Sequence, residues 1–219
     1  MKSVTEDKQK EYKLLKKGAV AEIVEKKSRF IASISPAATE EEASAFIASV
    51  KKQYWDARHN CSAFVIGAGG ELTRCSDDGE PSGTAGKPML EVLLGSGIRN
   101  ICVVVTRYFG GVLLGTGGLV RAYSGAVSNA LSECAVVKMI PGREIAVTCD
   151  YSYLEKIKNI LGKADIADPE AEYAENVSLR FFAPEDKYED VLKKITDATG
   201  GGAGYDISDP GYGEVPDRA

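Results

Sequence analysis

The sequence predicts an α+β protein of two small domains. A chain of 219 residues fits two domains, because single domains most often have roughly 100–150 residues. The hydrophobic fraction of 44% and the charged fraction of 27% are those of a globular protein with a proper core. Strand-like and helical periodicities alternate along the chain, and the pattern starts again near Pro141-Gly142. We therefore expect domains at 1–140 and 141–208.

The first strands and the first helix follow from hydrophobic spacing. Residues 19–25 and 28–35 alternate on either side of Lys26-Lys27, which is typical of a hairpin. Thr39 followed by Glu42 is a capping-box signature, in which each side chain satisfies a free backbone N–H at a helix start. The apolar residues that follow have helical spacing, so the sequence predicts an amphipathic helix over 40–54.

The rest of the first half alternates buried strands with glycine-rich segments. Cys61–Ile66 and Ile101–Thr106 are compact apolar runs, typical of buried strands, and we expect a long loop between them. A second helix is predicted over about 117–133. Residues 1–16 are expected to be helical or disordered.

The second half predicts a ferredoxin-like βαββαβ domain. Its strands and helices are expected, in order, at 145–149, 154–161, 166–173, 177–181, 188–195 and 205–207. The tail over 209–219 is rich in Gly, Pro and Asp, and such a composition predicts disorder.

The composition indicates the cellular compartment and excludes some classes of partner. No apolar run approaches the roughly 18–20 residues of a membrane span, and the charged N-terminus is no signal peptide, so we expect no membrane partner. Five widely spaced cysteines argue against a disulfide framework and favour the cytoplasm. Residues 1–140 hold 18 Lys and Arg against 15 Asp and Glu, and residues 141–219 hold 9 against 17. Neither half has the basic excess of a duplex-DNA-binding domain.

A first dense motif runs from Ser76 to Pro88. Asp77, Asp78 and Glu80 lie within four residues and beside three glycines, so they could hold Mg²⁺ or support a loop that binds an anion. The alternative is turn chemistry, since Asp side chains close local turns and Pro fixes φ.

A second motif runs from Arg107 to Arg121 and leads from a buried strand into a helix, whose N-terminus can bind anions. It is not a Walker loop, because Thr116-Gly117 stand where Lys-Ser/Thr should be, and Val120 replaces the third glycine of the dinucleotide fingerprint. The alternative is that its glycines serve close packing alone.

His59 is the only histidine and precedes Cys61 by two positions. On a strand both side chains would point to the same face, so a Cys/His nucleophile pair is conceivable. A buried thiol and a hydrogen-bonding imidazole are the simpler reading. No CxxC pair is present, and the sequence predicts no zinc.

Three blocks, Asp56–Ala63, Asp77–Pro88 and Val105–Tyr123, closely resemble the bacterial YigZ branch of the IMPACT family. The resemblance implies a first domain with a ribosomal-protein-like βαβ-type sandwich and a second domain similar to the last domain of elongation factor G. Eukaryotic relatives in the family restrain a translation-initiation kinase by competing for its activator. The resemblance implies no established enzymatic activity for bacterial members.

Two functional hypotheses follow. In the first, the chain is a non-catalytic, translation-associated regulatory protein that binds RNA or a ribosomal partner, and it has no catalytic residue, metal or cofactor. In the second, it is a nucleotide- or phosphometabolite-binding enzyme that uses Mg²⁺ at Asp77, Asp78 and Glu80. The predicted binding residues are His59, Asp77, Asp78, Glu80, Gly83, Thr84, Lys87, Arg107, Tyr108, Gly110, Gly111, Gly115, Thr116, Gly117, Gly118 and Arg121. The oligomeric state is not predictable from the sequence.

Overall fold

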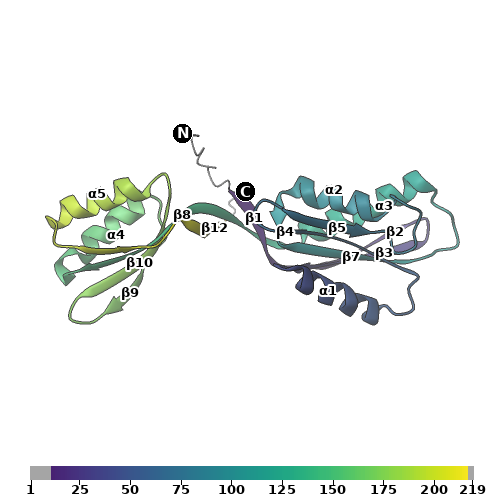
Figure 1. Ribbon diagram of the computed structural model, residues 1–219, viewed down its shortest axis with the longest axis horizontal. Helices are drawn as coiled ribbons and strands as arrows, with labels where there is room; N and C mark the ends of the chain where they lie inside the picture. The colour runs from purple at the N-terminus through teal and green to yellow at the C-terminus, as the bar shows by residue number, and fades with distance from the viewer. Residues whose placement is uncertain (1–10, 217–219) are drawn as a thin grey trace, which may run out of the picture. The chain divides into compact units, whose positions relative to one another are not determined.

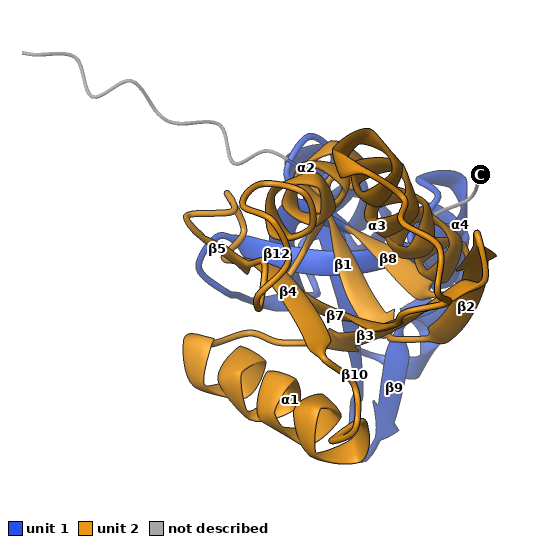
Figure 2. Ribbon diagram, turned by 90° about the vertical axis from the view of Figure 1, so that its right-hand side faces the viewer, with its two compact units in different colours: residues 1–11, 139–215 blue, residues 12–138, 216–219 orange. Residues whose placement is uncertain are grey.

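The computed structural model describes residues 11–216 (Figure 1). The chain divides into two compact units, one holding Tyr12–Lys138 and the other Met139–Val215 (Figure 2). The structure is of the α+β class that the sequence predicts, with five α-helices and two sheets in the described part of the chain.

The Tyr12–Lys138 unit is built on a five-stranded antiparallel sheet with the order β2-β3-β7-β4-β5. Helices α2 and α3 cover one face of this sheet and α1 covers the other (Figure 1). A short strand, β1, pairs in parallel with β6 outside this sheet. The elements are β1 (Tyr12–Lys17), β2 (Val20–Glu25), β3 (Ser28–Pro36), α1 (Glu40–Gln53), β4 (His59–Ile66), β5 (Leu72–Ser76), α2 (Gly86–Ser96), β6 (Ile98–Arg99), β7 (Ile101–Tyr108) and α3 (Thr116–Ser132).

The central strands β4 and β7 are buried on both faces, which explains the apolar runs Ala63–Ile66 and Ile101–Val105 within them. Val103 and Val105 of β7 pack into the core beneath α2 and α3, whereas Cys102, which directly precedes Val103, packs into a smaller core beneath α1. The alternation of a strand thus supplies both layers. Helix α1 begins as the sequence predicts. The hydroxyl of Thr39 accepts from the backbone N–H of Glu42, and the Glu42 carboxylate accepts from that of Ala38.

Two predictions for this unit are wrong. The segment between β4 and β7, expected to be a long loop, contains β5 and α2. Pro88 suggests a helix breaker, but it lies in the first turn of α2, where a missing N–H costs nothing. Of residues 1–16, expected to be helical or disordered, those from Tyr12 onward belong to β1, which pairs with β6. Residues 1–10 lie outside the described part of the chain.

The Met139–Val215 unit has the ferredoxin-like fold that the βαββαβ order predicts. Its antiparallel strands follow the order β11-β8-β10-β9, and α4 and α5 cover one face (Figure 1). Its core lies between these helices and the sheet and includes Val147, Ile157, Leu179 and Ile195. The elements are β8 (Ala135–Cys149), α4 (Leu154–Lys163), β9 (Glu170–Tyr173), β10 (Val177–Pro184), α5 (Tyr188–Thr199), β11 (Gly204–Ile207) and β12 (Gly211–Pro216), with a 3₁₀ turn at Tyr151–Tyr153.

Two features of this half differ from expectation. The hydrophobic pattern starts again at Pro141-Gly142, but the chain has no linker there, because β8 runs without interruption through these residues. The division between the units falls at Lys138/Met139. The tail is not disordered over 211–216, where it forms β12 and pairs with β8. Gly213 allows this, since a Cβ there would lie 2.4 Å from the ring of Phe182. Residues 217–219 lie outside the described part.

Each unit has a core of its own, and we predict that a fragment of residues 1–139 folds by itself. Its two clusters of buried side chains use residues of that span alone, while the third cluster uses residues from 145 onward. Thermal unfolding of the fragment, followed by circular dichroism, should give one cooperative transition. A fragment that aggregates or melts without cooperativity would show that the two units share one folding core.

Candidate functional site

The site lies where β4 begins and β7 ends, so two strands far apart in sequence present their terminal side chains together. His59 stands opposite Arg107 in the sheet, and Asn60 stands opposite Thr106. The buried Thr106 hydroxyl donates to the side-chain oxygen of Asn60 over 2.7 Å. The register of β4 against β7 therefore fixes the positions of His59 and Arg107.

Asp78 attaches the loop after β5 to this corner. Its carboxylate accepts from Lys51 over 2.6 Å and from the backbone N–H of Asn60 over 2.7 Å. Its backbone carbonyl lies 2.9 Å from Nδ1 of His59. Since a carbonyl oxygen can only accept, Nδ1 carries the proton and Nε2 of a neutral His59 is an acceptor. Asp78 has a φ of 42°, a left-handed conformation that Asp tolerates better than most residues.

Asp77 closes the same loop upon itself. Its carboxylate accepts three backbone hydrogen bonds, from Gly83 (2.8 Å), Ala85 (3.0 Å) and Gly86 (2.8 Å). Ala85 and Gly86 begin α2, so Asp77 satisfies N–H groups that the helix itself leaves free. Thr84 closes the middle of the loop by donating its hydroxyl to the carbonyl of Pro81 over 2.6 Å.

These bonds decide the protonation of both aspartates. Burial alone would raise the pKa of Asp77, but the backbone donors of Gly83, Gly86 and Ala85 outweigh it and hold that pKa below its ordinary value. The pKa of Asp78 is also lowered. There burial is outweighed by Lys51 and by the N–H of Asn60.

Glu80 is buried and lies at the centre of a polar network. Its Oε1 accepts from Arg107 over 2.6 Å and from the Tyr123 hydroxyl over 2.8 Å. Arg107 is also buried, and its guanidinium stacks over the rings of Phe30 and Phe109 at 5.5 and 5.7 Å. This ion pair therefore ties the loop after β5 to β7 and to α3.

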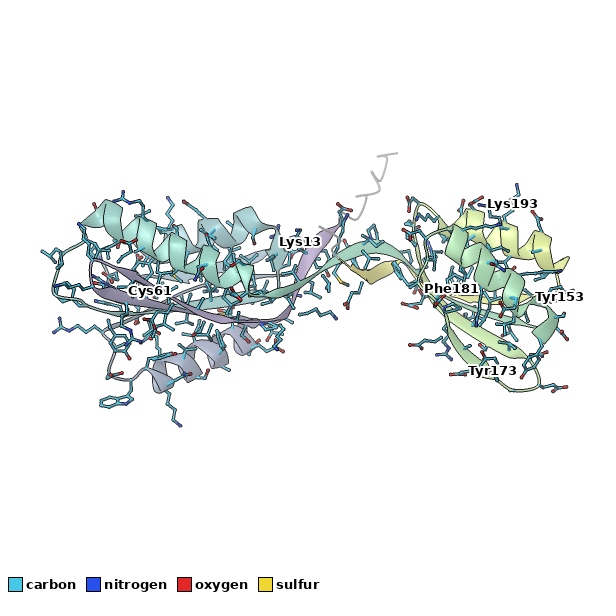
Figure 3. The ribbon with its side chains drawn as sticks, turned by 180° about the vertical axis from the view of Figure 1, so that it is seen from behind. Lys13, Cys61, Tyr153, Tyr173, Phe181 and Lys193 are labelled. Carbon is cyan, nitrogen blue, oxygen red and sulfur yellow. The ribbon has the colours of Figure 1, made fainter. Side chains whose placement is uncertain are left out.

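Cys61 belongs to the same interior and is labelled in Figure 3. Its thiol lies 3.0 Å from the carbonyl oxygen of Asp77 and 3.4 Å from the Tyr123 hydroxyl. Burial raises the pKa of Cys61 to about 12, and burial likewise raises the pKa of Tyr123. A thiol in this state is a structural group, because the thiolate is the nucleophile. Cys61 and His59 accordingly have separate hydrogen-bond partners.

The glycines of the second motif have three structural roles. A Cβ on Gly110 would lie 2.0 Å from the backbone carbon of Lys27, so Gly110 allows the chain to cross the β2–β3 turn. Gly111 and Gly115 have φ values of 82° and 73°, which favour glycine. Thr116, Gly117 and Gly118 form the first turn of α3, which has no side-chain cap, and Arg121 is exposed one turn further on.

A cavity of about 300 Å³ opens beside the end of β7. Within it, the Tyr108 hydroxyl donates to Oδ1 of Asp56 over 2.7 Å. Arg58 is exposed and has no ion pair among the described residues. The cavity is lined by Asp56, Arg58, His59, Arg107, Tyr108, Phe109 and Leu113.

The structure thus groups some of the sequence-predicted residues and separates others. His59, Arg107 and Tyr108 line the cavity, and Asp78 and Glu80 are bonded to its wall. The remainder are not cavity-lining residues: Asp77, Gly83 and Thr84 hold the loop, Lys87 is exposed on α2, and Gly110, Gly111, Gly115, Thr116, Gly117, Gly118 and Arg121 form the loop and the start of α3.

Sequence reasoning missed four cavity residues, namely Asp56, Arg58, Phe109 and Leu113. The sequence positions of three of them could have indicated their role. Asp56 and Arg58 directly precede a buried strand beside the only histidine, and Phe109 follows the end of another buried strand. Their proximity depends on the pairing of β4 with β7, which the sequence does not specify.

The geometry does not support the Mg²⁺ alternative. The carboxylates of Asp77, Asp78 and Glu80 each have protein donors of their own, and they point to three different partners. Over residues 11–216 we find no group of three or more His, Cys, Asp or Glu side chains that could hold a metal ion. Nor does any helix in that span have the length and apolarity needed to cross a membrane.

Fold and site together define a two-domain α+β protein with a polar and aromatic cavity on its Tyr12–Lys138 unit. The family model for the Impact N-terminal domain matches residues 26–131, and a domain of unknown function, DUF1949, matches residues 147–201. The IMPACT family member YvyE of Bacillus subtilis is 45% identical over 87% of this chain and 88% of that protein. The chain belongs to the IMPACT family.

Other relatives agree. The IMPACT family member YigZ of Escherichia coli is 44% identical over 80% of this chain and 87% of that protein. The mouse protein named IMPACT is 33% identical over 42% of this chain and 30% of its own length. A crystal structure described as a hypothetical protein is 40% identical, with a TM-score of 0.58, and covers 89% of this chain and 96% of that one.

We predict that Glu80→Gln destabilises the protein by about 3–5 kcal/mol, because it leaves the buried Arg107 charge without a counter-ion. Urea unfolding would measure the change. Glu91→Gln, on the exposed side of α2, is the matched control and should change stability by less than about 0.5 kcal/mol. A loss below about 1 kcal/mol for Glu80→Gln would show that the ion pair does not hold the corner together.

Asp77 should make stability depend on acid pH. Its folded-state pKa lies below the ordinary 3.8, so the ionised group stabilises the native state above that pH. This stabilisation is lost as the pH falls from about 3.8 through the lowered value. Urea unfolding at a series of pH values should therefore show a shallower acid decline for Asp77→Asn than for the wild type. Parallel declines would contradict the assignment.

Proposed function

We propose that this chain is a non-catalytic, translation-associated protein that binds unpaired RNA through its Tyr12–Lys138 unit. The observation that carries the proposal is the cavity, where Arg58 and His59 lie beside the rings of Tyr108 and Phe109. Proteins recognise single-stranded RNA by stacking its bases on aromatic side chains and by pairing its phosphates with arginine. The association with translation rests on membership of the IMPACT family.

Two exposed aromatic side chains of this unit fit the same role. Trp55 is 82% exposed and Phe109 is 56% exposed. A base stacked on either ring would remove apolar ring surface from water, which favours binding. Trp55 is close in sequence to Arg58, which directly precedes β4. The start of β4 and the end of β7 therefore bring a charged group, Arg58, and a stacking group, Phe109, to the same cavity.

The glycine-rich segment into α3 would extend the surface. The N–H groups of Thr116, Gly117 and Gly118 lie in the first helical turn, where N–H groups lack intrahelical acceptors and favour phosphate. Arg121 adds an exposed positive charge on the same helix. In this proposal Lys87 is a further phosphate contact.

Charge balance favours unpaired RNA over duplex. The first 140 residues hold a small excess of 18 basic over 15 acidic side chains, so few phosphates can be neutralised at once. Recognition must then come from contacts with exposed bases, which a duplex does not offer. The acidic Met139–Val215 unit would repel RNA and set its orientation or the choice of a protein partner.

A binding role also agrees with the chemistry of the interior. The Cys61 thiol has a raised pKa, and the Glu80 carboxylate is engaged by Arg107 and Tyr123. Neither is available as a nucleophile or a base. These groups stabilise the surface on which RNA would lie.

We predict that Arg58→Ala and Arg121→Ala each weaken binding of a fluorescent single-stranded RNA about tenfold to a hundredfold. Each variant loses a charge-assisted contact, worth on the order of 1.5–3 kcal/mol. Arg74→Ala is the matched control, since Arg74 is exposed on β5, is paired with Glu40 of α1 and does not line the cavity. Fluorescence anisotropy at several salt concentrations would give the affinities, which should fall as salt rises.

Equal losses in all three variants would mean nonspecific charge attraction and contradict the assigned surface. The proposal is wrong if the wild type binds no RNA. Binding to ribosomal proteins alone would replace RNA with a protein partner.

A further inference from the structure

The cavity beside β7 combines three kinds of binding group within about 300 Å³. This volume is at the lower limit of pockets that hold small molecules, so it can take one small unit and not a stretch of chain. Its wall carries positive groups, hydrogen-bond acceptors and aromatic rings. Such a combination restricts the ligand more than any one group would.

The positive groups suit an anion. Arg58 is exposed and has no ion pair within residues 11–216, and its planar guanidinium matches the oxygens of a phosphate. Arg107 is only 8% exposed, and its Nε has no hydrogen-bond partner although Nη1 is bonded to Glu80. Because this Nε is fully buried, Arg107 adds positive charge to the wall of the cavity and leaves Arg58 as the donor that a ligand can reach.

The acceptors suit a ligand that also has donors. Tyr108 holds Oδ1 of Asp56, which leaves Oδ2 of that carboxylate for another donor. Nε2 of His59 is a second acceptor, since Nδ1 donates to the carbonyl of Asp78. A simple inorganic anion would gain nothing from these acceptors and would be repelled by Asp56. The hydroxyls of a ribose would satisfy them.

The rings suit a base. Phe109 is 56% exposed, and the guanidinium of Arg107 stacks against it at 5.7 Å. Tyr108 is similarly stacked by Arg29 at 5.6 Å. These cations fix the orientation of the two rings, and the exposed part of Phe109 remains for stacking.

We infer that this cavity is a subsite for one ribonucleotide of the bound RNA. Arg58 binds its phosphate, Phe109 stacks its base, and Asp56 accepts a hydrogen bond from its ribose 2′-hydroxyl. The inference rests on the proposed function and adds to it a choice of RNA over DNA, because the 2′-hydroxyl is what distinguishes the two.

The test titrates the full chain with adenosine 5′-monophosphate, its 2′-deoxy form, adenosine and inorganic phosphate, each followed by NMR chemical shifts. The ribonucleotide should bind about tenfold more tightly than the 2′-deoxy form. Adenosine and phosphate alone should each bind more weakly still. Asp56→Asn should remove the preference for ribose, and Phe109→Leu should weaken both nucleotides equally.

Tyr108→Phe serves as a second variant at the ribose position. It removes the hydrogen bond that holds the Asp56 carboxylate in place without changing its charge, so it should reduce the same preference. Arg74→Ala should leave all four titrations unchanged. Melting temperatures of the variants would show that the fold is intact, because Asp56, Tyr108 and Phe109 are not in the core.

Equal binding of ribose and deoxyribose forms by the wild type would overturn the assignment of Asp56. Phosphate binding as tight as that of the nucleotide would reduce the cavity to an anion site and overturn the inference. If single-stranded RNA binds through Arg58 but no mononucleotide does, the subsite is wrong while the proposed function stands. If neither binds, both fail.

Discussion

The Tyr12–Lys138 unit depends on one buried ion pair, between Glu80 and Arg107. Placing two charges in an interior is unfavourable unless they are paired and hydrogen-bonded, and here the Tyr123 hydroxyl completes the pairing. The pair can form only if the loop after β5 returns to the end of β7 and α3 packs beside both. A long-range electrostatic requirement thus fixes the corner at which the cavity opens.

This constraint gives the acidic motif a structural meaning. Asp77 and Asp78 look like metal ligands in the sequence, since carboxylate oxygens are the ligands that Mg²⁺ prefers. In the structure their oxygens are occupied by backbone N–H groups of the loop, by that of Asn60 and by Lys51. The pKa values of both aspartates are lowered because the donors that hold the loop closed also stabilise the charged carboxylates.

The elements that the sequence predicts correctly are those with a strong local signal. The helix at Glu40–Gln53 has a capping box, and the ferredoxin-like half has six successive periodic segments. Helix α2 was missed because its start is stabilised by Asp77, nine positions before Gly86, which no local rule describes. The cavity was missed for a similar reason, since Asp56 and Tyr108 are 52 positions apart and meet only through strand pairing.

The charge distribution suggests how such a cavity could give selectivity without tight binding. A surface with a strong basic excess binds any nucleic acid, because released counter-ions drive association whatever the sequence or strandedness. This chain has a formal net charge of −5 and only a slight basic excess in its first 140 residues. Binding would therefore depend on the few contacts that an unpaired nucleotide can make with Arg58, Phe109 and Asp56. A duplex keeps its bases stacked and paired, so it could not stack a base on Phe109. Only the weak attraction between its phosphates and the positive side chains would remain. Weak overall affinity and preference for unpaired RNA then have the same physical origin.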